Sequence, residues 1–189
     1  MNALLRTAAV VAALASTAAS ANIVYTVNHA IGAGSIMGSI ETDGTQGTIS
    51  SANFVDWTFT ETSAALTNGS PATFGSALGG SINDGTSGSL SATPTDLIFD
   101  FGSGISSYLL FWASDFRHYY CLQSNGCYDF SGGGEAIGYG SNGPFSDYAE
   151  VLHHGSAQAF TDHSVPEPSA LALAALGLFG VGFLRRKQA

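Results

Sequence analysis

The sequence predicts an all-β domain flanked by two apolar terminal segments. Short stretches in which apolar and polar residues alternate recur between residues 22 and 161, separated by Gly, Asn, Asp, Ser and Pro. A period of two is typical of strands with one buried face, and a helical period is hard to find in this region. About ten such stretches at close spacing favour an antiparallel β-sandwich or jelly-roll-like ectodomain.

The clearest strand signal is the run NFVDWTFT at residues 53–60. Val55, Trp57 and Phe59 alternate with polar residues there, so we expect these three side chains to point into the core. The most apolar run, SYLLFWA at residues 107–113, is expected to form a central strand. Turns are expected at residues 43–44, 68–71 and 83–86. Further strands are expected at residues 23–27, 35–42, 47–50, 73–78, 96–101, 117–122, 135–140, 148–153 and 157–161.

The region between the terminal segments is strongly acidic. Four of the five Lys and Arg residues of the chain lie in those segments, which leaves Arg117 as the single base of the domain. Of the 14 Asp and Glu residues, only Glu167 lies outside it. A surface of this sign repels phosphate backbones, so we expect no nucleic-acid partner. The charge is enough to keep an exported domain soluble.

The N-terminus has the features of a secretory signal peptide. Arg6 precedes an apolar stretch at residues 8–15, and small residues follow. Ala19 and Ala21 fit the A-x-A rule, so we expect the signal helix to be cut after Ala21. This assigns residues 1–21 to the signal peptide and residues 22–156 to the β-rich ectodomain, which is long enough for one domain with its own core.

The C-terminus combines three different pieces in a fixed order. Val165, Pro166, Glu167 and Pro168 form a tetrapeptide whose prolines disfavour helix. An uncharged apolar run follows at residues 170–184, and a basic tail follows at residues 185–187. As a helix the run is about 22 Å long, which is short for a bilayer, but the basic tail favours a transmembrane helix with a cytoplasmic stop.

This arrangement resembles the PEP-CTERM sorting signal of Gram-negative bacteria. The resemblance rests on Pro166, Glu167 and Pro168, with Arg185 and Arg186 as the basic end. It implies export and a transient inner-membrane anchor through the C-terminal helix. It also implies recognition by an exosortase, a membrane cysteine transpeptidase that cuts near the motif. We assign residues 165–189 to this signal, and expect the polar linker at residues 157–164 to keep it clear of the folded domain.

Two cysteines, Cys121 and Cys127, enclose a short loop. Their even count and close spacing in an exported chain favour a disulfide, which closes a small loop and contributes about 2 to 3 kcal/mol. The spacing is not a common one for zinc.

The sequence contains no recognisable catalytic or metal-binding motif. Gly-x-Ser-x-Gly is absent, and Asp96 and Asp100 on one strand lie about 13 Å apart, too far for a glycosidase pair. Adjacent histidines such as His153 and His154 face opposite sides of a strand. His118 is expected to be a surface histidine, with a metal site built from His118 and a distant acid as the alternative. We therefore expect no enzyme and no cofactor.

Metal binding stays open, with calcium favoured in loops that contain Asp43, Asp84, Asp129 and Asp147, although turn geometry also explains these residues.

These observations favour an exported, non-catalytic protein of the cell surface or extracellular matrix, sorted by an exosortase. One alternative is a calcium-assisted carbohydrate-binding module in a biofilm matrix, with exopolysaccharide as its partner. The tyrosines that would stack on sugar rings are Tyr119, Tyr120, Tyr139 and Tyr148. A second alternative is a secreted hydrolase with two convergent acids in a cleft.

Overall fold

The computed structural model describes residues 21–63, 71–86, 88–102, 106–124, 132–140, 148–161 and 163–166. In these ranges the chain forms three antiparallel sheets and no α-helix, which confirms the predicted all-β class. The two terminal helices that we expected lie outside the described residues.

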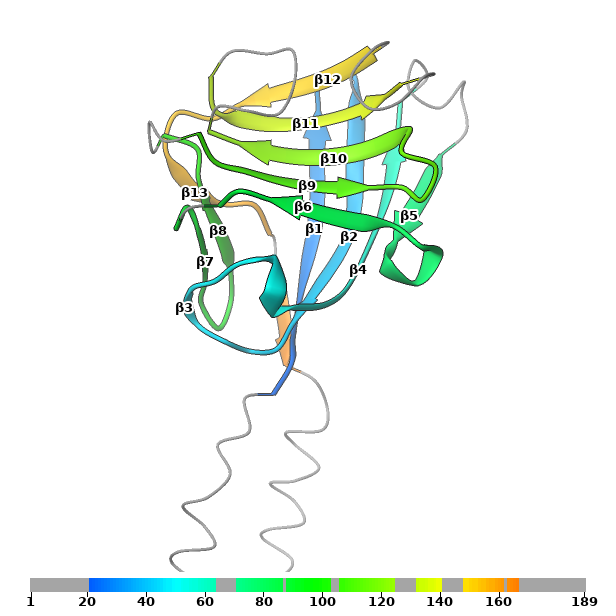
Figure 1. The fold of residues 1–189 in the computed structure, drawn as a ribbon. Coiled ribbons are helices and arrows are strands. Elements are labelled where there is room, and N and C mark those ends of the chain that lie inside the picture. Colours follow the sequence, from blue (N-terminus) through cyan, green and yellow to red (C-terminus); the bar gives the residue numbers. More distant parts are fainter. Residues whose placement is uncertain are drawn as a thin grey trace, which may run out of the picture.

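Two five-stranded sheets form the body of the domain (Figure 1). The first sheet has the order β14 (His163–Pro166), β1 (Ile23–Ile31), β2 (Gly34–Thr42), β4 (Phe54–Thr62) and β5 (Ala72–Gly75). The second has the order β12 (Tyr148–His153), β11 (Gly134–Tyr139), β10 (His118–Gln123), β9 (Tyr108–Trp112) and β6 (Ser81–Asp84).

A third, four-stranded sheet lies beside the other two (Figure 1). Its order is β13 (Ala157–Ala159), β8 (Leu97–Asp100), β7 (Leu90–Ala92) and β3 (Gly47–Thr48). Two single 3-10 turns, η1 (Ser51–Asn53) and η2 (Ser76–Leu78), flank β4 and β5.

The core lies between the two large sheets, whose strands cross in Figure 1, and it includes buried side chains of β7 and β8 from the third sheet. Aromatic rings from both sheets meet there: the Phe59 ring of β4 lies 4.9 Å from Phe111 of β9 and 5.0 Å from Tyr120 of β10. Such tilted and edge-on pairs stabilise the core beyond the burial of their area. The apolar run at residues 107–113 contains β9, an interior strand that pairs with β10 on one side and with the edge strand β6 on the other.

A β-bulge changes the expected pattern of β4. Trp57 and Phe59 are buried as predicted, but the Val55 side chain is 53% exposed. The pairing with β2 shifts between Glu41 and Thr42: Glu41 faces Asp56, Thr42 faces Phe54, and Val55 has no partner on β2. The extra residue reverses the alternation, so Phe54 packs against the core in its place. The prediction that Val55 points inward is therefore wrong.

The structure also corrects two other expectations. Residues 81–84, partly assigned to a turn, form β6 and pair with β9; the strand is polar because it lies at the edge of its sheet. The strand expected at residues 157–161 is observed as Ala157–Ala159, which pairs with β8. His163–Pro166 pairs with β1, so the linker does not keep the start of the sorting motif clear of the domain as expected. Both are short edge strands, whose backbone pairing leaves little periodic signal in the sequence.

Candidate functional site

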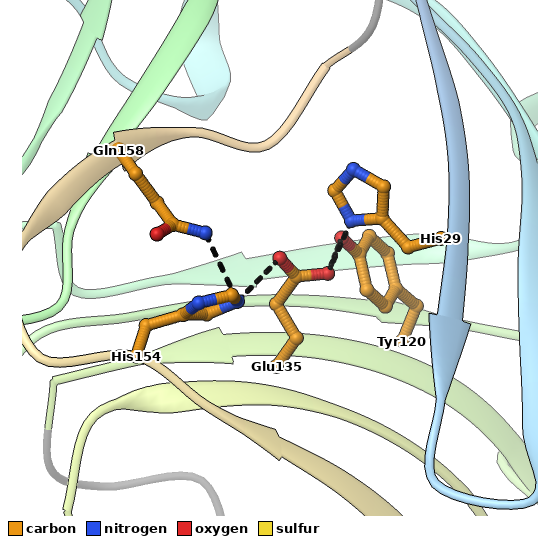
Figure 2. A network of polar contacts seen from close by, with 5 residues as sticks. All are labelled: His29, Tyr120, Glu135, His154 and Gln158. Atoms are coloured by element: carbon orange, nitrogen blue, oxygen red, sulfur yellow. Dashed lines mark hydrogen bonds and ion pairs between the residues drawn. The ribbon is translucent and has the colours of Figure 1, made fainter.

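A network of polar side chains surrounds Glu135 in the core (Figure 2). The Glu135 side chain is 0% exposed. The Tyr120 hydroxyl donates to Glu135 Oε2 at 2.8 Å, and His29 Nδ1 lies 2.8 Å from the same oxygen. On the other side, His154 Nε2 lies 2.9 Å from Glu135 Oε1. The Gln158 amide nitrogen lies 3.3 Å from His154 Nε2 and extends the network toward β13. The carboxylate therefore has a partner on each oxygen.

The surroundings of Glu135 favour its charged form. Burial by itself would raise the pKa of this carboxyl, but hydrogen bonds from His154, His29 and Tyr120 outweigh burial and lower its pKa below the usual range. A carboxylate held in this way by three side chains is poorly suited to remove a proton from a substrate. We interpret the network as a cross-link between β1, β10, β11 and the segment after β12.

A second buried acid, Glu61, joins β4 to β10. One of its oxygens, Oε1, is hydrogen-bonded to His118 Nδ1, whereas Oε2 is buried without a hydrogen-bond partner among the described residues. Burial raises the pKa of Glu61 despite the opposing effect of His118, and the nearby Asp115 raises it further. The bond from Glu61 also raises the pKa of His118, against the effect of burial. Together the two groups hold a proton more tightly than they would in water.

A small pocket opens beside this pair. It has a volume of about 160 Å³. Its polar lining includes His118, Asp115, Ser114 and Thr73, and its apolar lining is Ala72, Phe74, Leu78 and Ala113. The His118 side chain is 18% exposed, so this imidazole is both bonded to a buried carboxylate and accessible to a ligand. His118 is therefore a partly exposed residue whose imidazole is also bonded to the core, which the prediction of a surface histidine did not include.

A third buried acid, Glu150 on β12, binds the turn between β1 and β2. Its Oε2 accepts a hydrogen bond of 3.0 Å from the backbone N–H of Ala33. The preceding Gly32 has φ of 58°, and a Cβ at this position would overlap the Glu150 carboxylate. Only glycine satisfies both the left-handed backbone and this close approach.

The sequence contained a usable signal for one of these acids. Trp57, Phe59 and Glu61 share one face of β4, so extending the alternation by one step would have placed Glu61 in the core. Glu135 and Glu150 were missed because neither lies in a recognisable motif. The opposite orientation of His153 and His154 agrees with expectation, since His153 is exposed and His154 turns toward Glu135.

Several predicted ligand residues have other roles in the structure. Tyr120 is buried and bonded to Glu135, and Tyr119 is buried on the opposite face of β10, so neither is available to stack on a sugar. Tyr139 packs against His118 with a ring separation of 4.9 Å. Tyr148 belongs to β12, but its side chain lies outside the described part of the chain.

Of the two described aspartates, Asp43 caps its own turn, whereas Asp84 ends β6 and bonds to a distant backbone group. Asp43 accepts hydrogen bonds from the Thr45 backbone N–H at 2.9 Å and from the Asn53 side chain at 3.1 Å. Asp84 accepts one from the Ser51 N–H at 2.7 Å. Within the described ranges, no three His, Cys, Asp or Glu side chains are grouped as a metal site. Asp129 and Asp147 lie outside those ranges.

The predicted processing and disulfide residues are only partly described. Val165 and Pro166 belong to β14, and Ala21 precedes β1. Cys121 is buried on β10, whereas Cys127 lies outside the described residues, so the disulfide stays a prediction. Ala19, Glu167, Pro168, Arg185 and Arg186 also lie outside them. No helix in the described ranges is long and apolar enough to cross a bilayer, and residues 170–184 are not among them.

Comparison with known families assigns the C-terminal segment to a described sorting motif. The family described as the PEP-CTERM protein-sorting motif matches residues 164–187, whereas no curated protein and no solved structure matches the chain. A motif of this kind at residues 164–187 implies an exported, cell-surface protein. The segment is a PEP-CTERM motif, and this chain is an exosortase-substrate protein.

The first prediction concerns Glu135 and acid. Because its pKa is lowered in the folded state, Glu135 contributes stability that is present above its unfolded pKa of about 4.5 and is lost as pH falls through its folded pKa. We expect Glu135→Gln to lower the free energy of unfolding at pH 7 by about 3 kcal/mol and to flatten the acid slope below pH of about 4.5. Urea unfolding between neutral and acid pH measures both. Glu41→Gln, at a half-buried position on β2, is the control for the loss of an acid outside this network.

The second prediction concerns His118 and alkali. Its raised folded pKa contributes stability that is fully present below the unfolded pKa of about 6.5 and is lost as pH rises through the folded pKa. His118→Gln should therefore remove the loss of stability above pH of about 6.5. Thermal unfolding across neutral and mildly alkaline pH checks this, with His153→Gln at an exposed position as control. Equal alkaline slopes for wild type and His118→Gln would contradict the raised pKa.

Proposed function

We propose that this protein is a non-catalytic component of the cell surface or extracellular matrix, which an exosortase sorts and cuts near Glu167 and Pro168. The observation that carries the proposal is the sorting motif at residues 164–187, preceded by a predicted signal peptide at residues 1–21. In this proposal the ectodomain is a β-sandwich whose crossed sheets form a stable body. Its destination is the envelope surface or the surrounding matrix.

The geometry of the buried acids supports a non-catalytic role. A general acid or base must reach a substrate proton, directly or through one water. Glu135 instead has both oxygens engaged by protein side chains, and Glu61 is covered by the core with one oxygen bonded to His118. These carboxylates join the two sheets, and the proposal assigns them to stability.

The third prediction concerns maturation in the native host. Intact mass spectrometry of the protein from membranes and medium should find a new N-terminus at Asn22, a C-terminus near Glu167 or Pro168, and the loss of two hydrogens expected for a Cys121–Cys127 disulfide. A double substitution of Pro166 and Pro168 by Ala should retain the C-terminal tail, because the motif is altered. Asp162→Ala, just outside the motif, should mature normally. Recovery of the wild-type protein with its tail intact would exclude the proposed cut.

A second candidate function is binding of a neutral sugar at the β9–β10 turn. Phe116 in this turn has φ of 55°, which is rare for a bulky residue, and its side chain is 52% exposed. Strained backbone of this kind is retained when the surrounding structure holds it in place, often at a ligand site. The turn also contributes Ser114 and Asp115 to the pocket beside His118, which supplies polar partners for hydroxyl groups. The acidic domain disfavours an anionic polymer, so a neutral sugar fits better.

The fourth prediction tests this candidate. Phe116→Gly should keep the fold, because glycine adopts the positive φ without strain. It should weaken retention on a cross-linked dextran column about fivefold or more, because a stacking ring is lost. Val55→Ala, which removes another exposed apolar side chain on β4, is the matched control. Columns run with calcium and with a chelator test the calcium-assisted form of the idea. Equal retention of Phe116→Gly and wild type would exclude this turn as the sugar site.

A further inference from the structure

The last strand of the fold reaches into the sorting motif. β14 spans His163–Pro166, and the family match begins at residue 164. β14 pairs with β1 in an antiparallel register in which Ile23 faces Pro166, Val24 faces Val165 and Thr26 faces His163. The pairing makes β14 the edge of the first sheet, beside the first residues of β1, where the orange strand lies in Figure 1.

The position of Pro166 suits an edge strand. Proline has no N–H to donate, so within sheets it is confined to edges, strand ends and bulges. At the end of β14 it can lie beside β1 without breaking a ladder between two other strands. The first proline of the motif is therefore compatible with the sheet.

Pairing in the sheet restricts access to the motif. A protease or transpeptidase that acts on an extended peptide binds the backbone groups of that peptide. β1 already occupies the backbone groups on one side of residues 163–166, so a binding groove that encloses this segment on both sides cannot hold it while it is paired with β1. β1 is then a competitor for the residues that lead into the cleavage site.

The two processing sites also flank one strand pair. Ile23 lies two residues after the expected signal cleavage at Ala21, and its partner Pro166 lies immediately before Glu167. β1 and β14 therefore place the first residues of the mature chain beside the sorting motif.

We propose that β1 competes with the exosortase for residues 163–166, so that the C-terminal cut requires β14 to separate from the sheet. This inference rests on the proposed processing by an exosortase. Opening of a short edge strand costs less than global unfolding, so the domain stays folded while the strand detaches. The folded state thereby sets the fraction of time during which the motif is available to the enzyme.

A reversible lock tests the proposal in the full chain. Facing residues of an antiparallel pair have Cα atoms within the range that a disulfide spans. Thr26→Cys with His163→Cys should therefore join β1 to β14 and leave residues 164–187 unaltered. Pulse–chase labelling in the native host measures conversion of the precursor to the cut form, with each single cysteine variant as a control. Circular dichroism of the purified double variant checks that the fold is kept.

The oxidised double variant should be cut about tenfold or more slowly than the single variants, and a thiol reductant should restore the rate. If the double variant does not fold, Val24→Cys with Val165→Cys provides a second lock, with Val165→Cys alone as the control for the altered motif. An oxidised lock that is cut at the wild-type rate overturns the competition and leaves the proposed function standing. A wild-type chain that is never cut overturns the proposed function, and this inference with it.

Discussion

Three buried carboxylates tie the two large sheets together, and the arrangement of the domain depends on them. Glu61 of the first sheet bonds to His118 of the second, and Glu135 of the second bonds to His29 of the first. Glu150 of the second sheet accepts a bond from the turn between β1 and β2. Apolar packing alone tolerates small sliding between sheets, whereas directional bonds to buried acids fix one relative position, because leaving such an acid without a partner is costly.

The composition explains why histidine and tyrosine serve as partners. The domain contains no lysine and only Arg117 as a permanent base, so its buried acids meet imidazole, phenol and backbone N–H groups. Imidazole changes its charge near neutral pH, in contrast to a permanently charged partner such as arginine. The acid at Glu135 is held in its charged form, whereas the Glu61–His118 pair retains a proton, so the two bridges respond to pH in opposite directions. The stability of the domain is therefore limited toward both acid and alkaline pH.

Sequence reasoning predicted the strands whose side chains alternate and missed those that are held mainly by their backbones. β12 was expected at its observed bounds, and β4 was found from Trp57 and Phe59, because one buried face leaves a period of two. β6 and β14 are short edge strands, for which partner geometry matters more than side-chain pattern. The reversal at Val55 required knowledge of the register with β2.

The polar network was harder to predict than the sorting motif for a physical reason. The motif is read along a continuous segment, so its residues could be named from the sequence. Glu135, His29 and His154 lie far apart in the chain and meet only when β1 is placed across β11. No pattern along the chain reports how these two strands cross, and the bond between His118 and Glu61 was missed because the two residues are 57 positions apart.

The register of the terminal strands has a mechanical consequence. Ile23 and Pro166 face each other at one end of β1, so the two ends of the folded chain emerge side by side. A force that pulls these ends apart acts across the strand pair and breaks its backbone bonds one after another, which needs less force than sliding the strands along their length. Under such a load the backbone pairing between β1 and β14 would break first, while the aromatic core between the large sheets carried almost none of the tension.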